Sequence, residues 1–420
     1  MSGKPTRRDF LKTIGAAGLG SMLAVTGSPS VASNAVKSTD TDIKTVPTRP
    51  FGKTGVDVSI LSLGGVLDLS DVLVFKQAFN MGVTYWDTAD SYKWGKNEKA
   101  IGKYFARFPE DRKKVFLVTK ASTSEPQELT KKLNTSLERM NTPYIDMYFI
   151  HYVKDAKKEL TKEVKAWADK VKAQGKIRFF GFSAHKNMEH SMLVAAELGW
   201  VDGIMMSYNY RLMDKDDMKR AVDACVKSGI GLTAMKTQAA FSANFYASIG
   251  SEKDTALGMT ERFINQGYTT EQAKLMAVWQ NPYIASICSA MPNMTILKAN
   301  VAAALERGKL SSRDKRLLDL YAKQTASGYC AGCAHVCESA IACDMPISDL
   351  LRYSMYYYSY GERDKARLFF KSLPADVKES MLELDYANAE QCCPQNLPIG
   401  KVLKCWYDEL TSPCCVDSST

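Results

Sequence analysis

Eight short apolar runs, each followed by a longer amphipathic stretch, restrict the fold of this chain more than any other feature of its sequence. They occupy residues 59–63, 84–86, 115–119, 147–150, 177–183, 203–208, 231–236 and 284–289. Strands that alternate with helices form parallel sheets, because each crossover helix returns the chain to the same end of the sheet. Eight strands in this order fit a closed barrel. The sequence therefore predicts an α/β fold, a (β/α)8 TIM barrel over residues 49–310.

The stretches between the apolar runs have the spacing of amphipathic helices. They include residues 72–81, 129–139, 164–174, 188–198 and 218–228. Gly82, Gly175, Gly199 and Gly229 follow four of these stretches, and glycine readily takes the left-handed conformation that ends a helix. We expect these glycines to be C-terminal caps.

Four polar residues lie at or just beyond the ends of predicted strands. Asp87 follows the run at 84–86, Tyr92 comes five residues later, Lys120 ends the next strand and His151 ends the one after it. The carboxyl ends of barrel strands are where such enzymes carry their chemistry. Taken singly, each residue has a simpler structural explanation. Asp87 would form a surface ion pair, Tyr92 would be a loop aromatic, Lys120 a solvated strand end, and His151 a core histidine. Together, in this order, they favour a catalytic set.

The chain resembles the aldo-keto reductases over about residues 49–307. The resemblance rests on RPFGKTG at 49–55, on DTADSY at 87–92 with WGKNE at 94–98, on YID at 144–146, and on IRFFGFS at 177–183. It implies reduction of a carbonyl or oxidation of an alcohol on a small molecule. Tyr92 would be the general acid and base, Lys120 would lower its pKa, Asp87 would hold the ammonium, and His151 would orient the substrate oxygen.

The resemblance also implies a nicotinamide cofactor, NADP(H) or NAD(H), and assigns Ser183, Asn209, Lys236 and Asn300 to it. The expected Ser-Asn pair is broken by an alanine at 184, and the expected glutamine is replaced by a methionine at 205. Few basic residues follow the eighth strand, so a 2′-phosphate would find little compensating charge. Each lost polar contact costs on the order of 1 kcal/mol. Tight cofactor binding is therefore not secured by the sequence.

The first 35 residues resemble a twin-arginine export signal. TRRDFLK at 6–12 precedes a stretch at 13–27 that is rich in glycine and alanine, and SNA at 33–35 suits cleavage near Ala35. The apolar stretch is shorter than the ~20 residues of a membrane-spanning helix. We therefore expect the twin-arginine export machinery as a partner, a periplasmic or other extracytoplasmic location, and a linker at 36–48.

Cysteines are concentrated near the C-terminus, where nine of the eleven lie beyond residue 329. Cys330, Cys333 and Cys337 have the spacing of thiolates that can converge on one cluster. The segment AEQCCPQNLPI at 389–399 resembles the end of a ferredoxin-like tail found in an aldo-keto reductase subgroup. We expect a small, mainly helical module over 311–420 that holds a 4Fe-4S cluster with Cys393 as fourth ligand, or with Cys343 in its place. Disulfides or a zinc site are the alternatives.

A helical pattern at 350–373 carries seven aromatic residues, which we expect to pack the C-terminal module onto the barrel. The net charge of +9 includes no concentrated basic run outside the N-terminus, so we expect no nucleic-acid partner. The sequence therefore predicts an exported oxidoreductase. One rival is an iron-sulfur electron carrier with a redox partner protein, on a barrel that has lost dinucleotide binding. The other is a disulfide-stabilised binding barrel.

Overall fold

The computed structural model describes residues 45–65, 72–239, 263, 267–306 and 310–412. By its contacts the chain divides into Met1–Ile43 and Lys44–Thr420, and only the second unit contains described residues. The predicted export signal, and the predicted linker up to residue 44, thus lie outside them. The end of that predicted linker is ordered, since Val46 is buried and its N–H donates to the carbonyl of Met81.

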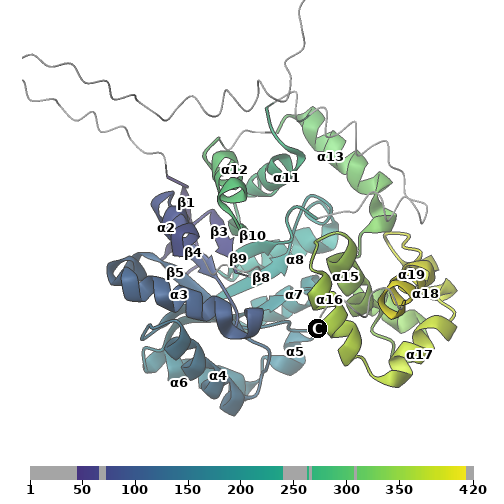
Figure 1. Cartoon of the computed structure of the whole chain (residues 1–420), viewed down its shortest axis with the longest axis horizontal. Helices are drawn as coiled ribbons and strands as arrows, with labels where there is room; N and C mark the ends of the chain where they lie inside the picture. The colour runs from purple at the N-terminus through teal and green to yellow at the C-terminus, as the bar shows by residue number, and fades with distance from the viewer. Residues whose placement is uncertain (1–44, 66–71, 240–262, 264–266, 307–309, 413–420) are drawn as a thin grey trace, which may run out of the picture. The chain divides into compact units, whose positions relative to one another are not determined.

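Eight parallel strands close into a barrel in the order β10-β3-β4-β5-β6-β7-β8-β9 (Figure 1). They are β3 (Leu61–Gly64), β4 (Tyr85–Asp87), β5 (Phe116–Ala121), β6 (Ile145–Ile150), β7 (Ile177–Ala184), β8 (Gly203–Ser207), β9 (Gly231–Met235) and β10 (Ile284–Ala290). Each coincides with a predicted strand to within a few residues. The predicted (β/α)8 barrel is therefore confirmed.

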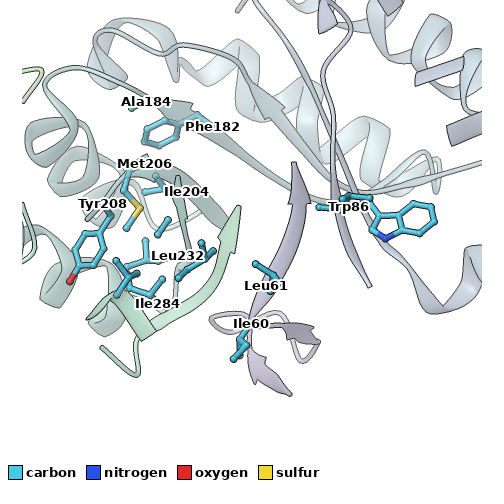
Figure 2. Close-up of a cluster of buried hydrophobic side chains, with 14 of the residues drawn as sticks. Ile60, Leu61, Trp86, Phe182, Ala184, Ile204, Met206, Tyr208, Leu232 and Ile284 are labelled. Carbon is cyan, nitrogen blue, oxygen red and sulfur yellow. The ribbon is translucent and has the colours of Figure 1, made fainter. Parts of the chain in front are cut away.

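Successive side chains of the barrel strands alternate between two apolar cores. Ile204 and Met206 on β8 belong to the outer core between strands and helices, of which Figure 2 shows a part. Met205 lies between them in sequence and belongs to the inner core, inside the barrel. This alternation follows from the two-residue period of a strand. Because both faces are buried, the strands appear in the sequence as continuous apolar runs.

A β-hairpin of β1 (Thr48–Pro50) and β2 (Asp57–Ser59) precedes the barrel and was not predicted. Its Phe51 is fully buried in the inner core, with its ring 5.4 Å from that of Phe116. Gly203 and Gly231 make room for that ring, because a Cβ at either position would lie within 2.7 Å of it. The hairpin thus fills one end of the barrel and leaves the other end for polar residues.

Helices follow most of the barrel strands. They are α2 (Val72–Asn80), α3 (Lys96–Arg107), α4 (Pro126–Arg139), α5 (Ala156–Glu159), α6 (Lys162–Ala173), α7 (Met188–Leu198), α8 (Asp216–Lys227), α11 (Thr270–Trp279) and α12 (Met294–Glu306). The four predicted capping glycines all have positive φ, between 70° and 81°. This is the left-handed conformation expected at helix ends.

The rest of the described chain is helical. It contains α13 (Ser312–Gln324), α14 (Ala334–Cys337), α15 (Ile347–Tyr358), α16 (Arg363–Ser372), α17 (Ala375–Glu383), α18 (Ala387–Cys392) and α19 (Ile399–Thr411). Helices α15 to α19, green to yellow in Figure 1, share a second apolar core around Trp406, whereas Leu318 and Tyr321 of α13 pack into the barrel's outer core. The boundary at residue 310 stays a prediction. None of the described helices combines the length and apolar character needed to cross a membrane.

Candidate active site at the carboxyl end of the barrel

Asp87 and Lys120 form a buried ion pair at the ends of the adjacent strands β4 and β5. The Lys120 Nζ lies 2.6 Å from Oδ1 and 2.7 Å from Oδ2 of Asp87, and it donates a third contact of 2.7 Å to the carbonyl of Thr88. Both side chains are at most 3% exposed. The ammonium donates two hydrogen bonds, to Oδ2 of Asp87 and to the Thr88 carbonyl, and the adjacent carboxylate compensates its buried charge.

Tyr92 and His151 lie beside this ion pair. The Lys120 Nζ is 5.0 Å from the centre of the Tyr92 ring, and the rings of Tyr92 and His151 meet edge to face at 5.7 Å. His151 follows β6, the neighbour of β5, and Tyr92 lies in the loop after β4. The structure therefore brings together all four residues of the predicted catalytic set.

Burial governs the protonation of these groups. The pKa of Tyr92 is raised well above its usual value, first by burial and then by the Asp87 carboxylate. The pKa of His151 is lowered well below its usual value, by burial and then by Lys120. We expected from the sequence that Lys120 would lower the pKa of Tyr92, whereas the net shift of that pKa is upward. Lys120 directs its ammonium at both oxygens of Asp87, so burial of the ring prevails.

Tyr92 also borders a large cleft, with a volume of about 1040 Å³. The cleft is lined on one side by the loop after β4 and by α4, and on the other by α16 and by Tyr353 of α15. His151 carries an Nδ1 atom with no hydrogen-bond partner among the described residues. A phenol that keeps its proton, next to a neutral imidazole with a free ring nitrogen, can protonate and orient an oxygen atom.

Two of the residues assigned to a nicotinamide cofactor contact the C-terminal region instead. The amide of Asn209 donates to the Tyr329 hydroxyl at 2.8 Å and to the carbonyl of Lys236 at 3.1 Å, while its oxygen accepts the N–H of Arg211. The Lys236 ammonium donates to the Tyr356 hydroxyl at 2.7 Å. Their polar groups are thus occupied by protein partners.

Ser183 and Asn300 complete the assigned set without forming an open site. The Ser183 hydroxyl accepts the N–H of Tyr152 at 3.3 Å, and Asn300 donates to the hydroxyl of Ser289 at 3.1 Å. The space between His185, Lys236 and Tyr356 measures about 20 Å³, room for about one water molecule. Of the four assigned residues, Lys236 borders this space, and the polar groups of the other three contact protein partners.

Sequence reasoning missed a row of rings that connects the catalytic set to the C-terminal region. Tyr152 stacks on His151 at 3.6 Å and lies 4.9 Å from the ring of His185. Arg352 of α15 lies 5.9 Å from the Tyr152 ring. Tyr152 has a left-handed backbone, with φ of 64°, directly after His151 at the end of β6. Its position next to His151 in the sequence was the one available signal.

Two of the sequence motifs prove to be structural. Asp146 of the YID motif accepts ion pairs from Arg112 at 2.9 Å and from Arg178 at 2.7 Å. Glu98 of the WGKNE motif is fully buried, where it accepts a hydrogen bond from Thr119 and pairs with Arg139 of α4. Both carboxylates join neighbouring elements of the barrel.

Four cysteines line one small cavity inside the C-terminal region. They are Cys330, Cys333, Cys337 and Cys393, surrounded by apolar side chains such as Leu351 and Ile399. Cys343 is exposed and does not border the cavity. All nine described cysteines are free, so the disulfide alternative has no support among them. Burial raises the pKa of Cys330 and of Cys337 to about 12.

The zinc alternative also lacks support. Within the described part of the chain, no three His, Cys, Asp or Glu side chains are grouped so that they could hold a metal ion. Ligands of one zinc ion meet at a single point, whereas cysteines around an iron-sulfur cluster bind different iron atoms and stand farther apart. The cavity that the four cysteines border measures about 10 Å³, room for no more than about one water molecule, so the predicted 4Fe-4S cluster stays a prediction.

Comparison with known proteins shows what the barrel is similar to. A model of the aldo/keto reductase family matches residues 68–257. An aldo-keto reductase of Fusarium vanettenii is 28% identical over 236 residues, which cover 44% of this chain and 62% of that protein. An aldo-keto reductase of Schizosaccharomyces pombe, whose name includes NADP(+), is 32% identical over 151 residues, which cover 33% of this chain and 43% of that protein.

These alignments leave part of each relative unmatched, since this chain spans about three fifths of the length of the Fusarium protein. Among solved structures, an aldo-keto reductase from Bacillus halodurans superimposes with a TM-score of 0.51 at 18% identity, covering 66% of this chain and 96% of that one. That likeness establishes the fold. Residues 68–257 of this chain are thus similar to the aldo/keto reductase family, and the fold is the (β/α)8 barrel described above.

Proposed function

We propose that this protein is an exported, aldo-keto-reductase-like oxidoreductase that reduces a small-molecule carbonyl compound or oxidises the corresponding alcohol. The observation that carries the proposal is the position of Tyr92, which lies between the Asp87–Lys120 ion pair, His151 and a cleft of about 1040 Å³. The oxidoreductase-like relatives support the same class of reaction.

The proton at the substrate oxygen is the part of the reaction that this chain's residues supply. Tyr92 keeps its proton at neutral pH because its pKa is raised, so it donates in the direction of reduction. His151 stays neutral because its pKa is lowered, and it orients the carbonyl oxygen through a hydrogen bond. Lys120 stabilises the phenolate that forms, at a distance of 5.0 Å from the ring centre. The hydride would come from NADP(H) or NAD(H).

Replacing the tyrosine hydroxyl tests the role of Tyr92. We expect Tyr92→Phe to reduce kcat for an aromatic aldehyde by about 10²- to 10⁴-fold, the usual contribution of a general acid. Tyr283→Phe is the matched control, because that ring is 54% exposed and distant in sequence from every residue of the set. Full activity of Tyr92→Phe would contradict the assignment, provided that the Tyr283→Phe enzyme is also active.

The four cysteines around one cavity support a 4Fe-4S cluster held by Cys330, Cys333, Cys337 and Cys393. Such a group would supply one-electron transfer or brace the fold. Iron and acid-labile sulfide are the direct measurements on protein purified without oxygen. We expect Cys393→Ser to lower the iron content and Cys343→Ser to leave it unchanged. Equal iron content in the unmodified protein, Cys393→Ser and Cys343→Ser would show that Cys393 is not a cluster ligand.

The contacts of Tyr329 and Tyr356 favour a second candidate function. Because they occupy Asn209 and Lys236, the barrel would serve as an iron-sulfur electron-transfer or partner-binding protein without a dinucleotide. Equilibrium titration with NADPH and NADH separates the two functions. Binding with a Kd in the micromolar range supports the reductase, which then requires the C-terminal region to move. A cluster-containing protein that binds neither nucleotide supports the electron carrier and a redox partner protein.

Export belongs to this proposal as well. The twin-arginine motif at residues 7–8 supports recognition by the twin-arginine machinery and a periplasmic or other extracytoplasmic location. The test is cell fractionation of the full chain beside a variant with both arginines changed to lysine. Equal export of the two would contradict this part of the proposal.

A further inference from the structure

The large cleft beside Tyr92 has walls from two parts of the chain. Tyr92, Lys93 and Trp94 of the barrel border one side, and the start of α16, from Arg363 to Lys365, borders the other. At about 1040 Å³ the cleft lies at the upper end of the ~300–1000 Å³ that small-molecule sites usually occupy. The C-terminal region thus forms part of the wall against which a substrate of Tyr92 would lie.

Positive charge predominates in the cleft once its ion pairs are accounted for. Lys132 pairs with Asp90 at 2.5 Å, and Lys365 pairs with Glu362 at 3.2 Å. Three further cations border the cleft and make no ion pair with any described residue, namely Lys93, Lys131 and Arg363. Among the acidic residues of the described lining, Glu128 is the one that makes no ion pair with a described residue. The surplus of cations favours an anionic ligand.

Aromatic surface accompanies this charge. Trp94 borders the cleft and is 79% exposed, which is unusual for the largest apolar side chain. Its backbone and that of Lys93 are left-handed, with φ of 58° and 48°. Strain of this kind in residues other than glycine persists mainly at functional sites. On the other wall, Tyr353 and Phe369 stack at 3.7 Å and 5° and add a flat apolar surface.

We propose that the cleft selects carbonyl substrates with a planar apolar body and a carboxylate, and that Arg363, Lys93 and Lys131 bind the carboxylate. The inference rests on the proposed function, because it concerns the substrate of Tyr92. It makes Arg363, in the C-terminal region, a specificity residue for a reaction at the barrel. Guanidinium and carboxylate form charge-assisted hydrogen bonds, which are the strongest that this lining offers.

Matched ligands test the inference on the full chain. The probes are 6-formyl-2-naphthoic acid, its methyl ester, and 2,6-naphthalenedicarboxylate, which has no aldehyde to reduce. We expect the dicarboxylate to bind more weakly to Arg363→Gln by about tenfold, measured as Kd by calorimetry, and to weaken further when KCl rises from 20 to 300 mM. The methyl ester should show neither effect. Arg316→Gln on α13 is the control, because that exposed arginine does not border the cleft.

The outcomes separate this inference from the proposed function. Equal kcat/KM for the acid and its ester, or equal Kd in the Arg363 and Arg316 variants, would overturn the inference while leaving the reductase intact. Binding of the dicarboxylate with the expected dependence on Arg363, but no turnover of either aldehyde with NADPH or NADH, would support the ligand class and count against the proposed reaction.

Discussion

Breaking the Asp87–Lys120 pair gives the sharpest test of how this site is built. At 2.6 Å, an effective dielectric constant of 20 gives about 6 kcal/mol of attraction between the two charges. Desolvation of two ions costs several kcal/mol each and offsets that attraction. Burial accordingly raises the pKa of Asp87 more than Lys120 lowers it. The pair is therefore worth little in net stability, but either partner alone is a buried, uncompensated group.

A double-mutant cycle measures this asymmetry. We expect Asp87→Asn and Lys120→Met each to lower the free energy of unfolding by about 3–5 kcal/mol. We expect the double variant to lose only about 1–2 kcal/mol, since no unpaired charge is left, so the coupling energy is at least about 4 kcal/mol. Urea unfolding followed by circular dichroism supplies the free energies.

The exposed pair Lys165–Asp169 provides the control cycle. Its atoms are just as close, at 2.7 Å, but its side chains are 45% and 57% exposed. Exposed pairs four residues apart on a helix couple by about 0.3–0.5 kcal/mol. If the Asp87–Lys120 cycle gave a coupling energy no larger than this control, the reasoning from burial would be refuted.

Two further predictions concern pH and the contact between the barrel and the C-terminal region. Lys274 is buried and has a pKa lowered to about 8. Between pH 8 and 10.5 the unfolded chain therefore holds a proton that the folded chain has lost. The free energy of unfolding should rise by about 3 kcal/mol over that pH range. Lys274→Met should abolish that slope in urea titrations, and a slope unchanged in the variant would exclude Lys274 as its source. Gly332→Ala places a Cβ 2.5 Å from the His185 carbonyl, so hydrogen exchange in α15 should increase. Gly361→Ala is the control, because it has a similar positive φ but open space around it, and equal exchange in both variants would contradict a steric origin.

The sequence alone determined the barrel and the order of its polar residues. A strand buried on both faces appears as an apolar run, and a glycine after a helix appears as a cap, because both patterns arise from local geometry. Parallel strands end at one side of the barrel, so the sequence predicts that Asp87, Lys120 and His151 lie close together. The structure confirms that meeting with the contact of 2.6 Å between Asp87 and Lys120.

Only the tertiary structure decided what surrounds these residues. The place of Phe51 inside the barrel depends on the space above Gly203 and Gly231, which lie some 150 residues or more away in sequence. The raised pKa of Tyr92 depends on burial by distant elements, so a charge argument from sequence gave the wrong sign. The contact of Tyr356 with Lys236 likewise joins segments 120 residues apart. Such contacts depend on long-range packing, for which local sequence patterns contain no signal.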